Sequence, residues 1–451
     1  MRFEKSTIQI LTNALRQLEQ GFDHLPQVTQ SYDLPAITKV LQAVAHEMQD
    51  NYPYFHPYYA GQMLKPPHPV ARAAYMLSLW INPNNHALDG GRASSRMEKE
   101  AVAEIAKLFH WDQHLGHLTG GGTLANTEAL WIAGKLNPEK VVTASSQAHY
   151  THNRMSGVLK LNYQVVPCDS EAKMDLTALK GLLDSGNVGT VVATIGTTGT
   201  GSVDPLEQLV KLRKQYGFHL HADAAYGGYF ILANNLHAKT RQAFDHLSEV
   251  DSIVIDPHKH GLQPYGCGCI IYRDPTIGRF YKHESPYTYF TSNDLHLGEI
   301  SLECSRAGAS AVALWATQQL LPMVPGGVFA SQLTLCREAA LSLYQRLEDD
   351  DRFKTILAPE LDIVIWTPDG SHISKISQKS EQLFREAMKH HLYLATFQYP
   401  TSQLPESWSD ITIDQPYVTC LRSCLMKPEH LEWIDQIWSK LDHSITELSS
   451  D

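Results

Sequence analysis

Two short apolar runs each lead to an ionisable residue, and this pair of endings constrains the fold more than any other feature. Phe218-His-Leu-His-Ala222 leads into Asp223, and Ser252-Ile-Val-Ile255 leads through Asp-Pro-His into Lys259, 36 residues beyond Asp223. Such runs are typical of buried strands, and the segment between them is long enough for one crossover helix. Because ligands bind at the carboxyl ends of strands in open parallel sheets, we expect Asp223 and Lys259 to share one cleft.

The pair allows two interpretations. Asp223 and Lys259 could form a structural ion pair. Alternatively, Lys259 could form a Schiff base with pyridoxal phosphate while Asp223 pairs with the pyridine nitrogen, so that the ring accepts electrons when a bond at Cα of the substrate breaks. Both alternatives stay open on these two residues alone.

Strand-like runs alternate with helical patterns through the middle of the chain, which predicts an α/β fold with a mostly parallel sheet covered by helices. We expect three regions: a helical segment at 1–60, a large domain at 61–320 and a small α+β domain at 321–451. The small domain is predicted to contain a helix at 329–347, strands at 361–366 and 417–421, and a closing helix at 428–441.

Composition excludes several classes of protein. Hydrophobic residues make up 43% of the 451-residue chain, enough for a large core, and the net charge of -11 disfavours sequence-independent nucleic-acid binding. The seven cysteines are dispersed and odd in number, which favours reduced thiols in a cytoplasmic protein. The N-terminus lacks the apolar block of a signal peptide, and no stretch approaches the length of a membrane helix, so we expect no membrane partner.

Three further motifs carry polar groups suited to a ligand. Thr119-Gly-Gly-Gly-Thr123 precedes a helical pattern, as at anion-binding helix N-termini, although a plain glycine-rich turn is equally compatible. His149 follows a strand and could lie over an aromatic ring. His149 and His152 are three residues apart, but no HExxH or CxxC partner accompanies them, so no metal site is expected. The run Gly196-Thr-Thr198 ends another strand with hydroxyl groups. Cys267 and Cys269 are interpreted as small strand residues rather than as metal ligands.

Together these motifs resemble those of the group II pyridoxal-phosphate-dependent amino-acid decarboxylases. The matching segments follow the family's order: TGGGTLANTEALW, AHYTH, HADAAYGGY, DPHKHGLQPYGCG and SLECSRAGASAVALW. The resemblance implies the aspartate-aminotransferase-like fold (fold type I), with a mostly parallel seven-stranded sheet in the large domain. It also implies pyridoxal 5'-phosphate as cofactor.

The resemblance assigns roles to individual residues. Lys259 matches the Schiff-base lysine, Asp223 the partner of the pyridine nitrogen, His149 the imidazole stacked on the ring, and Ala225 the small residue on the opposite face. Positions around the phosphate and the ring hydroxyl match Gly122, Thr123, Thr198 and His258. Arg422 matches an arginine that holds the substrate carboxylate, with a structural salt bridge as the alternative.

The resemblance also implies a homodimer with active sites at the interface, in which a loop after Lys259 presents a proton-donating tyrosine. Ser-Pro-Tyr287-Thr-Tyr289 resembles the loop of bacterial tyrosine decarboxylases and indicates Tyr287, with Tyr289 second. Counting back from Arg306 by the glutamate decarboxylase pattern leads instead to Leu295. The segment 1–60 is expected to pack on the partner.

The function implied is decarboxylation of an L-amino acid to an amine and CO₂. An aromatic, tyrosine-like substrate is favoured by the loop, with Tyr52, Tyr54 and Phe55 as pocket residues. The alternative is glutamate or aspartate held by Arg422, His86 or His56. Another lyase, an aminotransferase, an aldehyde synthase or a non-enzymatic binding protein of the same fold are further alternatives.

Overall fold

The computed structural model describes residues 5–282 and 298–448. Its centre is a seven-stranded sheet in the order β1-β7-β6-β5-β4-β2-β3. The strands β2 to β6 pair in parallel, whereas β7 runs antiparallel to both β1 and β6. The predicted mostly parallel seven-stranded sheet is therefore confirmed. The strands are β1 Leu115–Thr119, β2 Val141–Ser145, β3 Tyr163–Val166, β4 Val188–Thr194, β5 His219–Asp223, β6 Ser252–Ile255 and β7 Gly268–Tyr272.

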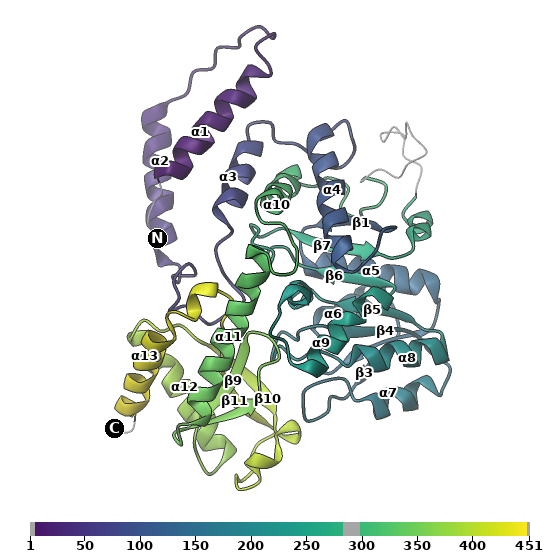
Figure 1. Cartoon of the computed structure of the whole chain (residues 1–451), viewed down its shortest axis with the longest axis vertical. Coiled ribbons are helices and arrows are strands. Elements are labelled where there is room, and N and C mark those ends of the chain that lie inside the picture. Colours follow the sequence, from purple (N-terminus) through teal and green to yellow (C-terminus); the bar gives the residue numbers. More distant parts are fainter. Residues whose placement is uncertain (1–4, 283–297, 449–451) are drawn as a thin grey trace.

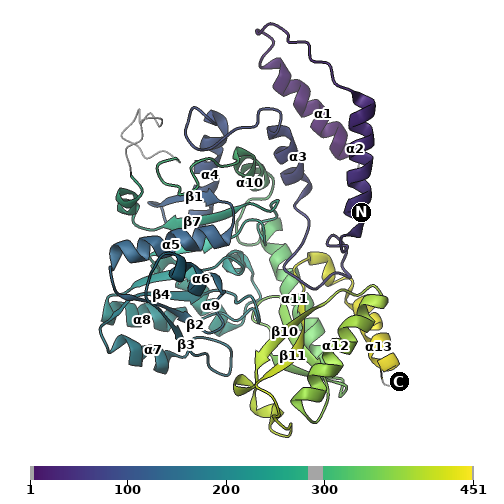
Figure 2. The ribbon, with the colours of Figure 1, turned by 180° about the vertical axis from the view of Figure 1, so that it is seen from behind.

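The central strands are apolar because both faces of the sheet are covered. All seven residues of β4 are buried, as expected for a strand with helices on both sides. Figure 1 and Figure 2 show the helices arranged around this sheet. These helices are α4 Arg92–Leu108, α5 Gly122–Leu136, α6 Thr151–Val158, α7 Leu176–Leu183, α8 Leu206–Tyr216, α9 Ala238–Asp245 and α10 Gly308–Leu320.

A second, four-stranded sheet follows along the chain, with all neighbouring strands antiparallel in the order β10-β11-β9-β8. The expected closing helix at 428–441 is wrong in its bounds: Pro428–His430 forms a single 3-10 turn, and the helix begins at Ile434. The elements are α11 Val328–Glu348, β8 Phe353–Leu357, β9 Ile363–Pro368, α12 Ile373–Lys389, β10 Ala395–Pro400, β11 Tyr417–Cys424 and α13 Ile434–Leu448.

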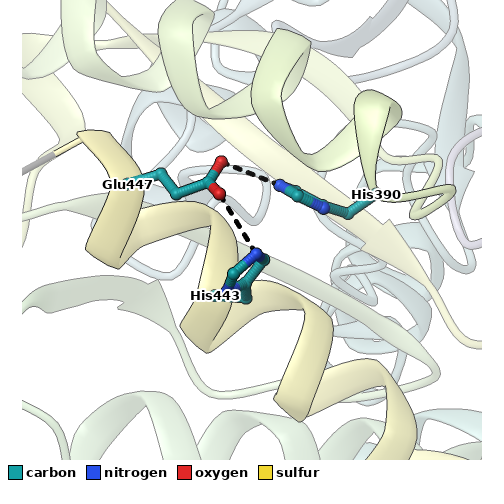
Figure 3. A group of neighbouring side chains, drawn as sticks. All are labelled: His390, His443 and Glu447. Carbon is teal, nitrogen blue, oxygen red and sulfur yellow. Dashed lines mark hydrogen bonds and ion pairs between the residues drawn. The ribbon is translucent and has the colours of Figure 1, made fainter.

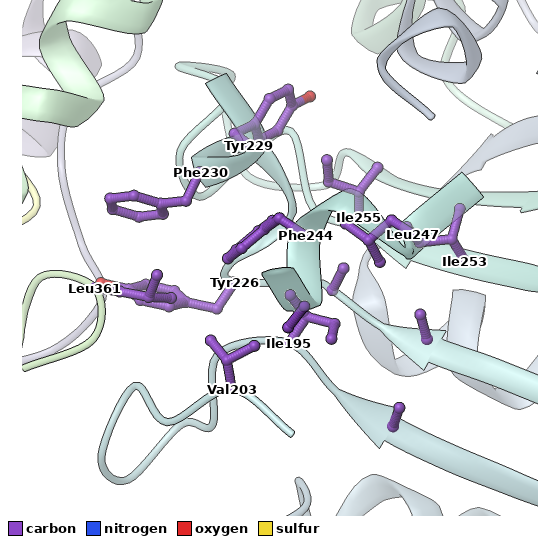
Figure 4. Packing of buried hydrophobic residues seen from close by; sticks show 14 of the residues in the cluster. Ile195, Val203, Tyr226, Tyr229, Phe230, Phe244, Leu247, Ile253, Ile255 and Leu361 are labelled. Atoms are coloured by element: carbon purple, nitrogen blue, oxygen red, sulfur yellow. The ribbon is translucent and has the colours of Figure 1, made fainter. Parts of the chain in front are cut away.

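One hydrophobic core runs through both sheets. Leu361, just before β9, is fully buried among side chains of the segments that follow β4 and β5, including Ile195, Tyr226 and Phe230 (Figure 4). Its neighbour Asp362 is also buried and accepts a hydrogen bond from the Tyr226 hydroxyl at 2.6 Å. The small sheet therefore contacts the loop that follows β5.

The first helices form an arm that projects from the rest of the molecule in both ribbon views (Figure 1, Figure 2). The helix α1, Lys5–Gln20, contacts α3, Pro69–Ser78, whereas α2, Leu34–Glu47, has no buried residue. Asp33 begins α2 by accepting a hydrogen bond from the Ala36 amide. Large apolar side chains of this arm are exposed, namely Ile8, Ile10, Phe22, Leu25, Val28, Tyr32, Leu34, Ile37, Val40, Leu41, Val44 and Met48. Among the helices that the structure describes, none has the length and apolar character needed to cross a membrane.

Candidate active site

The two strand endings that precede Asp223 and Lys259 in the sequence lie side by side. Asp223 is the last residue of β5 and pairs in register with Val254 of the adjacent strand β6, after which the chain continues to Lys259. Asp223 and Lys259 both line one cavity of about 620 Å³ at this edge of the sheet. The expectation that the two side chains share a cleft is confirmed.

The carboxylate of Asp223 is held by a buried histidine. His152 Nε2 donates to Asp223 Oδ2 over 2.8 Å, and the Ala225 amide donates to Asp223 Oδ1 over 3.2 Å. Burial alone would raise the pKa of Asp223, but the hydrogen bond and charge of His152, together with the charge of Lys259, hold this pKa below its usual range. The site therefore keeps an anion ready to pair with a cationic ring nitrogen.

The amine of Lys259 has a different partner. Lys259 Nζ lies 3.0 Å from Asp256 Oδ2, a carboxylate that is 2% exposed and also lies 3.5 Å from His258 Nε2. The backbone amide of Asp256 donates to the Ala225 carbonyl at 3.2 Å, which ties the lysine loop to the loop after β5. Lys259 itself is one-fifth exposed and so is accessible from the cavity.

The glycine motif also lines the cavity, next to the lysine loop. Gly121 has φ +149° and precedes α5, whose first residues Gly122 and Thr123 line the cavity. A Cβ at Gly122 would lie 2.5 Å from Asp256 Oδ2, so only glycine allows this approach. The helix N-terminus supplies free N–H groups and a partial positive charge, as a phosphate requires.

The remaining cofactor residues predicted from the sequence also line this cavity: His149, Ala225, Thr198 and His258. His149 Nδ1 is 2.7 Å from the Thr151 hydroxyl, which is itself 3.4 Å from the hydroxyl of Thr123. Burial lowers the pKa of His149 and that of His258. The physical cause is the loss of water around the two rings, which disfavours their charged form.

The chemical groups that line the cavity are those that pyridoxal phosphate requires. The cavity brings together an amine for the aldehyde, a carboxylate for the ring nitrogen and a helix N-terminus with hydroxyl groups for the phosphate. Glycine at positions 121 and 122 leaves space beside the cavity that the Cβ of any other residue would occupy.

Within the described parts of the chain, the residues predicted to bind the substrate do not line this cavity. Arg422, on β11, is buried and donates to the Thr198 carbonyl at 2.8 Å and to Gln62 Oε1 at 2.5 Å. The side chain therefore lies behind the cavity wall, where it supports the loop of Thr198. Its predicted contact with a substrate carboxylate stays a prediction.

The aromatic stretch packs on itself and on the small domain instead. The ring of Tyr54 lies edge-on to Tyr59 at 4.9 Å, and Tyr52 lies 5.2 Å from Tyr393. His56 stacks edge-on against Trp433, and burial lowers its pKa. His86 and Phe55 also lie outside the set of cavity residues.

Sequence reasoning missed two site residues. The sequence suggests His152 only as one half of a metal pair with His149, whereas in the structure its imidazole contacts Asp223. Asp256 directly follows a predicted strand, a position that could have marked it as a partner for Lys259. The predicted proton donors Tyr287 and Tyr289, and the alternative position Leu295, lie outside the described residues.

Comparison with known proteins agrees with this geometry. Residues 131–367 match the family model of the pyridoxal-dependent decarboxylase conserved domain. A probable L-tyrosine/L-aspartate decarboxylase of Methanothermobacter thermautotrophicus is 30% identical over 331 residues, which cover 72% of this chain and 86% of the relative. The L-tyrosine decarboxylase of Enterococcus faecium is 27% identical and covers 72% of this chain and 71% of the relative.

Solved structures share the fold. Oryza sativa TDC with PLP and tryptamine superposes with a TM-score of 0.79 at 16% identity, covering 99% of each chain. Mouse CSAD in apo form gives a TM-score of 0.78 at 18% identity, covering 98% of each chain. With the family model spanning more than half of the chain, the sequence and the site lead to the same conclusion: this chain belongs to the pyridoxal-dependent decarboxylases and is a pyridoxal-phosphate-dependent amino-acid decarboxylase.

Proposed function

We propose that the enzyme decarboxylates an aromatic L-amino acid of the tyrosine class to its amine and CO₂. The observation that carries the proposal is the cavity shared by Asp223 and Lys259. No arginine, and no lysine other than Lys259, lines this cavity within the described residues, so an acidic substrate side chain has no permanent cation to pair with there. Relatives named for tyrosine support the same substrate class.

The cofactor roles follow from the chemistry of the cavity residues. When bound, pyridoxal phosphate supplies the sink for the electrons released as the Cα–carboxylate bond breaks. Lys259 would hold the cofactor through its amine, and Asp223 would hold a proton on the ring nitrogen. His149 and Ala225 would hold the two faces of the ring. Gly122, Thr123, Thr198 and His258 would surround its phosphate and hydroxyl.

The chain's own groups also set the direction of the reaction. The carboxylate of Asp223, kept ionised by His152, would keep the ring nitrogen protonated, and a positively charged ring accepts electrons from the substrate more readily. His149 is a candidate to protonate Cα after CO₂ leaves. Tyr287 is the other candidate, proposed from the sequence resemblance alone.

L-Aspartate is the second candidate substrate, because the archaeal relatives are named for both tyrosine and aspartate. In this case a cation from outside the described cavity lining would pair with the side-chain carboxylate. Arg422, His86 and His56 are the candidates from the sequence. Tyr54 is retained as a proposed contact for an aromatic ring.

We further propose a homodimer located in the cytoplasm. The exposed apolar side chains of the arm formed by α1 and α2 support burial against a second copy, because a folded monomer rarely leaves so many apolar residues in water. All seven cysteines are free, which supports a reducing compartment. Sedimentation velocity and cell fractionation test these two statements.

The substrate is tested by measuring CO₂ and amine from L-tyrosine, L-phenylalanine, L-tryptophan, L-aspartate and L-glutamate with added cofactor. We expect kcat/KM for L-tyrosine to exceed that for L-aspartate by about tenfold or more, since a buried site without a counter-charge disfavours an anionic side chain. Equal or greater activity on L-aspartate would contradict the proposed aromatic substrate and favour L-aspartate.

The reaction class is tested with Lys259→Ala. This variant should lose the visible absorbance of the bound cofactor and release CO₂ at least about a thousandfold more slowly, because the amine that holds the cofactor is gone. Formation of a keto acid or an aldehyde in place of the amine by the unmodified enzyme would contradict the proposed product.

A further inference from the structure

A second cluster of ionisable side chains lies on the small domain, outside the cavity of the active site. His390 directly follows α12, whereas His443 and Glu447 stand one turn apart on α13, which packs against α12. Figure 3 shows the three side chains converging from these two elements. Their polar atoms face one another although 53 residues separate His390 from His443 along the chain.

The distances in this cluster suit a single bound ion. His390 Nε2 lies 3.0 Å from Glu447 Oε2, and His443 Nε2 lies 3.1 Å from Glu447 Oε1. One donor atom from each residue lies within 4.8 Å of the others. In a tetrahedral zinc site with ligand bonds of 2.0–2.1 Å, ligand atoms lie about 3.3 Å apart. Small side-chain rotations would therefore place all three donors around one ion.

We propose that His390, His443 and Glu447 bind a divalent transition-metal ion such as Zn²⁺. Two imidazoles and one carboxylate are a donor set that suits zinc, cobalt, nickel or copper, whereas Mg²⁺ and Ca²⁺ require mostly oxygen ligands. The spacing of four residues between His443 and Glu447 aligns both side chains on one face of α13. Among residues 5–282 and 298–448, this is the group of histidine and acidic side chains with such a geometry.

A further carboxylate lies beside His390. Glu386 Oε1 is 3.4 Å from His390 Nε2 and adds negative charge next to the proposed site. The C-terminal carbonyl groups of α12 add partial negative charge beside His390. Two cations oppose them: Lys389 pairs with Glu386 at 2.6 Å, and Lys440 donates to the His390 carbonyl at 2.7 Å. The latter contact also fixes the backbone of His390 against α13.

The site is accessible and would have a structural role. The side chain of His443 is 60% exposed, so an ion could enter from solvent without unfolding. An ion held at once by α12 and α13 would join the last helix to the small domain and would stabilise the folded state by mass action. Because none of the three ligands lines the active-site cavity, the ion would leave decarboxylation unchanged.

The test is isothermal titration of the cofactor-loaded enzyme with ZnCl₂. We expect saturable binding whose affinity falls by about tenfold or more in His443→Ala and in Glu447→Gln, because each change removes one ligand. His46→Ala, which removes an exposed histidine of α2, is the matched control and should leave binding unchanged. Titration with MgCl₂ should give no binding at this site.

Cofactor absorbance and CO₂ release measured on each variant show that it is folded, so a lost zinc signal can be attributed to the lost ligand. Absence of saturable zinc binding to the unmodified enzyme would overturn the proposal. So would zinc binding of equal affinity in both ligand variants, because the three side chains would then form only a hydrogen-bonded cluster.

Discussion

The buried imidazole of His152 donates to the carboxylate of Asp223 over 2.8 Å, and this contact sets the charge at the base of the active site. His149 lines the cavity from the turn just before α6, whereas His152 is the second residue of α6 and holds the carboxylate. The charge state of Asp223 thus depends on a residue outside the cavity lining.

We expect His152→Ala to weaken cofactor binding. Removal of the imidazole leaves a buried carboxylate short of a partner, at a cost of about 1–3 kcal/mol, which corresponds to about 5- to 150-fold in cofactor affinity. Reconstitution of the cofactor-free protein, followed by visible absorbance, measures the change. His46→Ala is the control, and unaltered affinity and kcat in His152→Ala would show that Asp223 needs no such support.

We expect Gly122→Ala to prevent cofactor binding. The added Cβ would meet Asp256 Oδ2 at 2.5 Å, so either the carboxylate or the start of α5 must move. The matched control is Gly181→Ala within α7, where an added Cβ meets nothing within 4 Å. The control should gain about 0.5–1 kcal/mol of stability, since alanine is favoured over glycine in helices. Cofactor absorbance and urea denaturation of both variants measure these effects, and normal loading of Gly122→Ala would contradict the packing.

We expect acid to destabilise the protein partly through His221. Burial lowers the pKa of His221 to about 3, whereas an imidazole in an unfolded chain has a pKa of about 6.5. The unfolded state therefore binds the extra proton first as the pH falls below about 6.5, and stability decreases from there toward about pH 3. The slope contributed by this one group approaches about 1.4 kcal/mol per pH unit.

Urea denaturation of the cofactor-free protein at pH 7 and at pH 5 measures this effect. His221→Gln keeps a polar group near Asn126 and Ser252 but removes the titration, so the difference between the two pH values should shrink. An unchanged difference would assign the acid sensitivity to other groups.

We expect Leu361→Ala to impair both stability and the active site. Leu361 is fully buried, and a Cβ at Gly196 would lie 2.8 Å from its Cδ1, so this side chain supports the loop that carries Thr198 (Figure 4). Truncation of a buried leucine costs about 2–5 kcal/mol. Thermal unfolding and cofactor affinity measure the two effects, with Leu335→Ala on the exposed face of α11 as the control. A stability loss equal to that of the control would contradict the role of Leu361.

The runs ending at Asp223 and preceding Lys259 could be read as strands because both faces of the central sheet are covered, which makes such strands continuously apolar. The strands β1 and β3 could not be read so easily. They lie at the edges of the sheet, where Leu-Gly-His-Leu-Thr and Tyr-Gln-Val-Val mix apolar residues with glycine, histidine or glutamine. The elements β8, β10 and α12 of the small domain were also not predicted from the sequence. They are partly exposed, so apolar and polar residues alternate irregularly along them.

The sequence by itself determined the class of fold, the cofactor chemistry and the residues whose types that chemistry requires, because strand periodicity and reactive side chains are local properties of the chain. Tertiary structure alone decided which side chain pairs with which. His152 beneath Asp223, Arg422 behind Thr198 and His390 facing Glu447 are all contacts between separate segments. Such pairings depend on how the sheets and helices pack, and they cannot be predicted from the spacing of residues within one segment.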